Sequence, residues 1–277
     1  MNAVCFLARF GSLLFFTVAC TAANTVYAGA WTLPEGTGQA INTLTFYRVD
    51  RRFDEDGERR SSTRFEKIEF SPYIEYGLRD DLTIGTQPSF QYLRQESGDD
   101  FVTNSGFADV DLFVRQRLWQ DEGRVFSVQA YVSLPTGYNG DAQPALGDDQ
   151  IDLELRLLFG QGLTLSGRNA FYNIEGAYRW RLEAPADEVR LDLTAGIRPN
   201  ADWLLLAQSF NTIGVGNEGS RGIVQTSGPD YDIYKLQLSG VRQLSGDLFV
   251  QLGGYTEYAG RNTGAGNAVF TALWITF

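Results

Sequence analysis

The feature that most constrains this chain is a repeated alternation of apolar and polar residues with a period of two, beginning near residue 40. It is clearest over residues 151–159, where Asp152, Glu154 and Arg156 alternate with apolar residues. Successive side chains of a β-strand point to opposite faces, so this period indicates strands. No stretch has convincing helical periodicity, and the chain is predicted to be all-β. Twelve strands are expected, over residues 40–52, 64–76, 82–93, 106–119, 124–134, 151–159, 169–181, 188–198, 203–210, 231–243, 247–258 and 267–277.

The connections between these segments distinguish two all-β architectures. A soluble β-sandwich would show the same alternation, because the period tells only that one face is apolar. Here, however, short and long connections alternate, as in a barrel with tight periplasmic turns and long external loops. The sequence therefore favours a transmembrane, antiparallel up-and-down β-barrel. The expected short turns are 78–81, 120–123, 199–202 and 244–246, with 161–167 somewhat longer, and the expected long loops are 53–63, 94–105, 135–149 and 211–230.

Aromatic residues and the end of the chain favour the barrel as well. Aromatics gather near the strand ends, which is typical of the girdles at the two membrane interfaces. They are Tyr76, Trp119 and Trp203 at the turn end, and Tyr92, Tyr178, Trp180, Tyr231, Tyr234 and Tyr258 at the loop end. The chain ends in the alternating series Leu273, Ile275 and Phe277. This ending resembles the assembly signal of outer-membrane barrels, which implies recognition by the barrel-assembly machinery.

Two prolines depart from the strand pattern. Pro72 and Pro88 fall within expected strands, where a proline removes a hydrogen bond of the ladder. We expect bulges or local departures from regular pairing at both positions.

The N-terminal segment is typical of an export signal. Arg9 precedes an apolar run over residues 10–23, and the small residue Ala28 offers a cleavage site, with Ala30 as the alternative. The run is too short for a transmembrane helix. A lipoprotein signal at Cys20 is a further alternative, although the usual leucine before it is absent. The expected organisation is a cleaved signal peptide over 1–28, a periplasmic lead-in over 29–39 and an outer-membrane barrel over 40–277.

Composition excludes several functions. A net charge of −11 opposes nucleic-acid binding, which needs an excess of cations. The chain has no histidine, so histidine-based catalysis and histidine-ligated metal sites are excluded. We expect no enzyme activity, no cofactor and no metal site. Acidic groups at 54–58 and 148–152 lack the loop spacing of a calcium site, and we interpret them as solvated loops near lipopolysaccharide. The glycines of 214–219 precede no helix and indicate a loop rather than a phosphate site.

The polar faces of the expected strands carry the candidate functional residues. In a twelve-stranded barrel these faces enclose a narrow lumen, which is either a small pore or is filled by side chains. The charged residues form a constriction that selects solutes in the first case, and a closed polar network in the second. The candidate pore-lining residues are Asp109, Asp111, Arg115, Arg117, Asp152, Glu154, Arg156, Glu175, Arg179, Arg190, Asp192 and Arg198.

Short stretches of the chain resemble two known families. Residues 106–112, Leu134-Pro135-Thr136-Gly137 and residues 146–149 resemble outer-membrane barrels of the phenol-degradation MetA-pathway type. Residues 29–38 are similar to XagA-like outer-membrane proteins. The first resemblance implies passage of small, aromatic compounds across the outer membrane. The second implies a part in exopolysaccharide export or surface attachment, and neither transfers a catalytic residue.

These observations predict a passive outer-membrane channel for small molecules, with a structural or adhesion-related barrel as the alternative. The expected partners are outer-membrane lipid and lipopolysaccharide, the barrel-assembly machinery, a small-molecule solute and, for the alternative, exopolysaccharide-secretion proteins.

Overall fold

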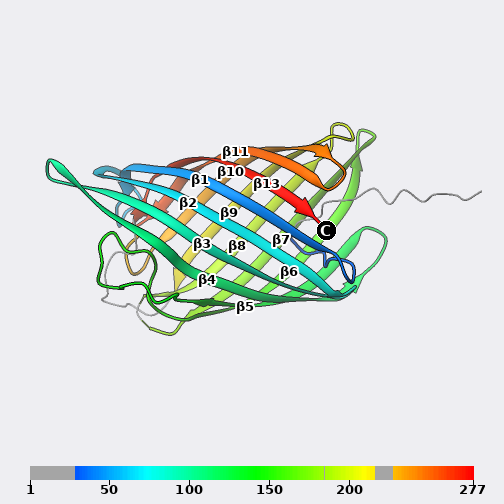
Figure 1. Cartoon of the computed structure of the whole chain (residues 1–277), viewed down its shortest axis with the longest axis horizontal. Coiled ribbons are helices and arrows are strands. Elements are labelled where there is room, and N and C mark those ends of the chain that lie inside the picture. Colours follow the sequence, from blue (N-terminus) through cyan, green and yellow to red (C-terminus); the bar gives the residue numbers. More distant parts are fainter. Residues whose placement is uncertain (1–28, 184, 216–226) are drawn as a thin grey trace, which may run out of the picture.

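The chain folds into one closed antiparallel barrel of twelve long strands (Figure 1). The computed structural model describes residues 29–183, 185–215 and 227–277. The expected signal peptide over 1–28 and most of the glycine-containing loop near 214–219 lie outside these residues. The long strands are β1 (Gly38–Phe53), β2 (Arg59–Arg79), β3 (Leu82–Ser97), β4 (Asp100–Gln120), β5 (Arg124–Leu134), β6 (Asp152–Leu165), β7 (Arg168–Arg181), β8 (Asp187–Ile197), β9 (Trp203–Val215), β10 (Asp232–Ser245), β11 (Leu248–Arg261) and β13 (Asn267–Thr276), with the two-residue β12 (Thr263–Gly264) between the last two.

Closure depends on β1, which pairs with β2 on one side and with β13 on the other. Gln39 lies opposite Thr276, so both ends of the barrel sequence meet at the end that holds the short turns. We call this the turn end and the opposite end the loop end. At the closing seam the backbone N–H of Phe277 donates to the carbonyl of Gly38 at 2.9 Å. Among the described residues, no helix has the length and hydropathy to cross a membrane.

All twelve expected strands are present, and the predicted fold class is confirmed. Two of the expected long loops are wrong. The loop at 53–63 has only residues 54–58, and 94–105 is a tight hairpin whose turn is Gly98-Asp99. Gly98 has a φ of +63°, which the first position of a type II′ turn requires. The strands β2, β3 and β4 therefore extend further than their apolar segments, and the β3–β4 hairpin projects beyond the loop end (Figure 1).

The two prolines face each other across β2 and β3. The register places Phe70 opposite Phe90 and Ile74 opposite Thr86, and the ladder is interrupted between these pairs, where Pro72 and Pro88 lie. The pairing of β3 with β4 also shifts between Pro88 and Phe90. The departures expected at both prolines are thus present, because neither residue has an N–H to donate.

The outer face of the barrel is apolar. Large hydrophobic residues at alternate positions of the strands are exposed, including Leu153, Leu155 and Leu157 of β6. Most residues of the expected aromatic girdles are also on this face, and Tyr234 contacts Tyr258 there. Tyr231 is an exception, because its hydroxyl donates to Glu188 inside the barrel at 3.0 Å. The polar residues between the exposed positions point inward, and they build the site.

Candidate functional site

Ten of the twelve candidate pore-lining residues lie inside the barrel. Arg156, Glu154, Glu175, Arg179, Asp152, Arg190 and Asp192 join one ion-pair network on β6, β7 and β8, Asp109 and Asp111 lie on β4, and Arg115 forms a separate pair. Their part in conduction stays a prediction.

The other two candidates, Arg117 and Arg198, lie at the turn end, beyond the ion-pair network, and their part in the pore stays a prediction. Arg117 is at the turn end, where its Nη1 donates to Gln120 Oε1 at 2.6 Å, next to a bulge that breaks the alternation of β4. Arg198 follows the last residue of β8 and precedes Pro199, which cannot continue the ladder.

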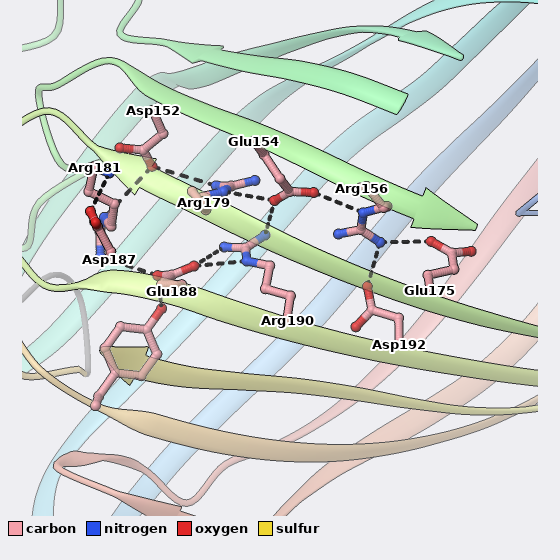
Figure 2. A network of polar contacts seen from close by, with 11 residues as sticks. Asp152, Glu154, Arg156, Glu175, Arg179, Arg181, Asp187, Glu188, Arg190 and Asp192 are labelled. Carbon is pink, nitrogen blue, oxygen red and sulfur yellow. Dashed lines mark hydrogen bonds and ion pairs between the residues drawn. The ribbon is translucent and has the colours of Figure 1, made fainter. Parts of the chain in front are cut away.

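The ion-pair network follows the register of three neighbouring strands (Figure 2). Glu154, Arg179 and Glu188 are directly opposite one another across β6, β7 and β8, so charges alternate along this row. Nε of Arg179 lies 3.0 Å from Oε2 of Glu154. Arg190 approaches both glutamates, at 2.5 Å from Glu188 and 3.6 Å from Glu154. Cross-strand pairs of opposite charge stabilise a sheet, and this row fixes three strands together.

Arg156 joins the network to a second row nearer the turn end. Glu175 and Asp192 lie directly opposite each other on β7 and β8, which places two carboxylates side by side. Nη1 of Arg156 contacts both, at 2.7 Å from Glu175 and 2.6 Å from Asp192, and its Nε lies 2.8 Å from Glu154. Figure 2 shows all three carboxylates directed at this one guanidinium. A planar guanidinium suits such multiple pairing and keeps its charge when it is buried.

Several members of the network were not predicted. Arg181 and Glu188 form an ion pair at 3.2 Å, and Arg181 also pairs with Asp148. In total the four arginines Arg156, Arg179, Arg181 and Arg190 form ion pairs with six carboxylates, namely Asp148, Asp152, Glu154, Glu175, Glu188 and Asp192. The network therefore carries more negative than positive charge.

Arg115 and Glu75 form a second buried pair, on β4 and β2. Their side chains are each 4% exposed, and Nη1 of Arg115 lies 3.2 Å from Oε2 of Glu75. The guanidinium also donates to the Tyr73 hydroxyl at 3.0 Å and to Gln129 Oε1 at 2.9 Å. Nε, Nη1 and Nη2 of Arg115 each donate to an oxygen atom, as a buried charge requires. Glu75 lies on the polar face of the strand expected over 64–76, so the alternation of residues could have identified it as an inward-facing residue.

Residues 29–37, which we call the plug segment, belong to the expected periplasmic lead-in over 29–39. The first residues of the segment lie inside the barrel toward the turn end, Pro34 to Gly36 are exposed there, and Gly38 and Gln39 are part of β1. Arg115 donates to the backbone carbonyl of Trp31 at 3.0 Å, and the Ser127 hydroxyl donates to the carbonyl of Ala30 at 2.6 Å. Further along, the N–H of Leu33 donates to the Thr83 hydroxyl at 2.9 Å. These bonds come from β3, β4 and β5, so the wall of the barrel holds the backbone of the segment.

Trp31 is the apolar anchor of the plug segment. Its ring meets Phe171 of β7 edge-on, with the ring centroids 6.1 Å apart. It also packs against a buried inward-facing cluster of Phe171, Leu204, Leu206, Val241, Phe249, Ala272 and Trp274. Gly160 makes room for the ring, because a Cβ at this position would lie 2.6 Å from the indole. The turn end of the lumen is thus filled by apolar side chains around Trp31.

At the loop end, residues 135–151 fold into the mouth of the barrel, and we call them the cap loop. Tyr138 donates to Asp109 at 2.6 Å and accepts from the N–H of Asp149 at 2.7 Å. Burial and the bond to Asp109 raise the pKa of the Tyr138 phenol, so this hydroxyl stays a donor. Leu146 is 5% exposed and packs in a cluster with Leu93 of the neighbouring strand β3.

Between the cap loop and the network the lumen contains a chamber of about 520 Å³. Its walls carry Asp109, Asp111 and Arg190 among other charged residues. On each strand, the residues that line the chamber lie nearer the loop end than those that contact the plug segment. Asp111 and Arg115 of β4 illustrate this order. The chamber and the plug segment therefore occupy successive levels of one lumen.

One wall of the chamber carries both lysines of the chain, Lys67 and Lys235. Each lies over a tyrosine ring, at 5.9 Å from the Tyr47 centroid and 4.6 Å from the Tyr255 centroid. The two rings stack with centroids 6.0 Å apart. Sequence reasoning missed these tyrosines, because an aromatic residue among apolar neighbours predicts a lipid-facing position.

Comparisons with solved structures bear on this arrangement. The chain is similar to the COG4313 outer membrane channel from Pseudomonas putida F1, with a TM-score of 0.73 and 17% identity, covering 90% of this chain and 98% of that chain. It is also similar to the beta domain of the Bordetella autotransporter Brka, with a TM-score of 0.50 and 13% identity, covering 87% and 99%. The NanC porin has a TM-score of 0.48 and 8% identity, covering 84% and 98%. At these identities the first two similarities show the fold alone, which is the outer-membrane barrel expected from the sequence.

No curated protein matches the chain. The similarity of residues 29–38 to XagA-like proteins and the assembly role of Leu273, Ile275 and Phe277 stay predictions, although the three side chains are exposed on the outer face. One family model matches residues 23–273, and thus nearly the whole barrel. The chain therefore belongs to the family described as "Putative MetA-pathway of phenol degradation".

Proposed function

We propose that this barrel is a passive outer-membrane channel for small molecules, in which the plug segment closes the turn end of the lumen. The observation that carries the proposal is the chamber of about 520 Å³, placed in line with the plug segment inside one barrel. A volume of this order suits a ligand of a few hundred daltons. We propose no catalytic role for its charged residues.

The lining of the chamber supports passage of polar or charged small molecules. Carboxylates and cations face it from several strands, and such rings of charge select solutes by sign and size. The paired rings of Tyr47 and Tyr255 add an apolar surface to one wall. Passage of small aromatic compounds, which the family resemblance implies, is part of the proposal on this ground.

Conduction requires the plug segment to move. Its attachments are a few hydrogen bonds and the ring of Trp31, each of modest free energy. Displacement of these nine residues would remove the part of the filling that does not belong to the barrel wall and would leave the inward side chains of the strands around the widened passage. The segment is joined to β1 at the turn end, so it can leave in that direction.

The test is conductance of the refolded, signal-free protein in a planar bilayer. We expect rare or small openings of the wild type and frequent larger ones after deletion of residues 29–37 or in Trp31→Ala. Trp203→Ala is the matched control, because this tryptophan is 38% exposed on the outer face and should leave conductance unchanged. A folded deletion variant that conducts no ions would overturn the channel.

The alternative is a sealed barrel that supports exopolysaccharide export or surface attachment. The apolar cluster around Trp31 favours it, because a permanently filled turn end would block solutes. The two functions differ in one result of the same experiment. A sealed barrel stays silent after deletion of the plug segment, and its exposed loops then become the sites at which secretion partners are sought.

A further inference from the structure

Gly29 lies deep in the barrel, beside a carboxylate of the ion-pair network. A Cβ built on this residue would lie 2.8 Å from Oε1 of Glu175 and 2.5 Å from Nδ2 of Asn173. The backbone nitrogen of Gly29 is two bonds from that point, so it lies within about 5 Å of the Glu175 oxygen. The first described residue of the plug segment is therefore within reach of an ion pair with β7.

The network at this level has more carboxylates than cations in direct contact. Glu175 and Asp192 are opposed across β7 and β8, and Arg156 forms ion pairs with both, while Arg115 and Lys235 act on them over a longer range. Arg156 also pairs with Glu154, so one guanidinium forms ion pairs with three carboxylates (Figure 2). Buried carboxylates need compensating charge, and a further cation beside Glu175 would supply it.

We propose that cleavage of the signal peptide after Ala28 creates this cation, so that the free α-ammonium of Gly29 pairs with Glu175 and locks the plug segment in the lumen. The proposal rests on the plug of the proposed function and on the predicted cleavage site. An α-amino group has a pKa near 8, so it is mostly charged at neutral pH. Export processing and closure of the lumen are then one event.

The contacts of Ala30 distinguish the two predicted cleavage sites. Ala30 is fully buried, packs with Val125 and Leu158, and accepts the bond from Ser127. Cleavage after Ala30 would remove this residue and Gly29 from the mature chain and leave their niche empty. The buried contacts of Ala30 therefore favour cleavage after Ala28, as the proposal requires.

The experiment compares three forms of the refolded chain 29–277 that differ only at the α-amine: free, acetylated and dimethylated. Acetylation removes the charge, whereas dimethylation keeps it. The mature chain has no cysteine, since Cys5 and Cys20 precede Ala28, so Ala30→Cys provides a single thiol. Its alkylation rate reports release of the plug segment without any need for conductance.

We expect acetylation to raise the alkylation rate about tenfold, which corresponds to about 1.4 kcal/mol, and dimethylation to leave it within about twofold of the free amine. Glu175→Gln should raise the rate as acetylation does, and the two changes combined should add little, because they remove the same pair. Asp192→Asn is the matched control. It removes an equal charge and another partner of Arg156, but the atoms nearest a Cβ on Gly29 belong to Asn173 and Glu175, so acetylation should keep its full effect in that variant.

Equal alkylation rates for the acetylated and free forms would overturn the proposal. So would intact-mass analysis of protein from outer membranes if the mature chain began at a residue other than Gly29. Absence of conductance in every form would overturn the channel while leaving the ammonium–Glu175 pair intact. The failures of the two proposals are thereby separable.

Discussion

Arg115 of β4 and Trp31 of the plug segment are joined by a hydrogen bond of 3.0 Å between Nη1 and the backbone carbonyl. The same nitrogen lies 3.2 Å from the carboxylate of Glu75. One guanidinium thus connects the barrel wall to the segment that fills its lumen. Because the acceptor is a backbone atom, this contact depends on the position of the segment rather than on the identity of its side chain.

Arg115→Met should destabilise the barrel and release the plug segment. The substitution leaves Glu75 buried without its cation, which costs about 3–5 kcal/mol. Unfolding in detergent, followed by tryptophan fluorescence, measures this loss. The double variant Arg115→Met/Glu75→Gln should recover part of the stability but none of the contact with Trp31. An Arg115→Met protein as stable as the wild type would contradict the assignment of a buried pair.

Ion selectivity should respond to Arg156 and not to Arg117. Arg156→Ala removes the cation shared by Glu154, Glu175 and Asp192, so the reversal potential in a salt gradient should move toward cation selectivity. Arg156→Lys keeps the charge and controls for folding. Arg117→Ala should leave selectivity unchanged, because Arg117 lies at the turn end beside Gln120. A shift of equal size in the Arg117 variant would show that the turn end of the lumen sets selectivity as much as the ion-pair network does.

The alternation of apolar and polar residues predicted the strands well, because each strand of the barrel has one face toward lipid and the other toward the lumen. Glu154, Arg156 and Arg179 lie in regular strands, and their inward direction followed from the period alone. The period also holds for Arg117, which is paired with the inward-facing Ser127, and it fails only at the bulge that follows, where Leu118 and Trp119 are both exposed.

Other parts of the site were beyond this reasoning. Tyr47 points inward, where its hydroxyl donates to the carboxylate of Glu257. A tyrosine is equally suited to the membrane interface, so its residue type alone does not predict this direction. The plug segment has no strand period, and its position depends on contacts with residues 50 to 100 positions away, such as Thr83 and Ser127. Long-range contacts of single residues leave no local pattern in a sequence.

Gly77→Ala should displace the plug segment without altering any charge in the lumen. A Cβ on Gly77 would collide with the backbone carbonyls of Leu33 and Pro34, which cannot move away as a flexible side chain could. We expect more frequent openings in planar bilayers and faster alkylation of the thiol in Ala30→Cys. Gly176→Ala is the control, because a Cβ there meets nothing within 4 Å. Equal behaviour of the two alanine variants would show that the segment does not pass Gly77.

Tyr138→Phe should loosen the cap loop. The phenol donates to Asp109 and accepts from the N–H of Asp149, and loss of such buried bonds costs about 1–3 kcal/mol. Hydrogen exchange at the Asp149 amide should accelerate, while exchange in β6 should stay unchanged.

The difference in hydrogen-exchange rate at Asp149 between the wild type and Tyr138→Phe also has a defined dependence on pH. Burial raises the pKa of Tyr138 above the ordinary value of about 10, so the folded state favours the neutral phenol. The stabilisation is therefore fully present below pH 10 and is lost only as the pH rises through the higher value of the folded protein. Equal exchange rates at Asp149 in both proteins at pH 8 would mean that Tyr138 does not hold the cap loop. Faster exchange in Tyr138→Phe at pH 8, with the gap persisting at pH 10, is the result that the buried hydroxyl predicts.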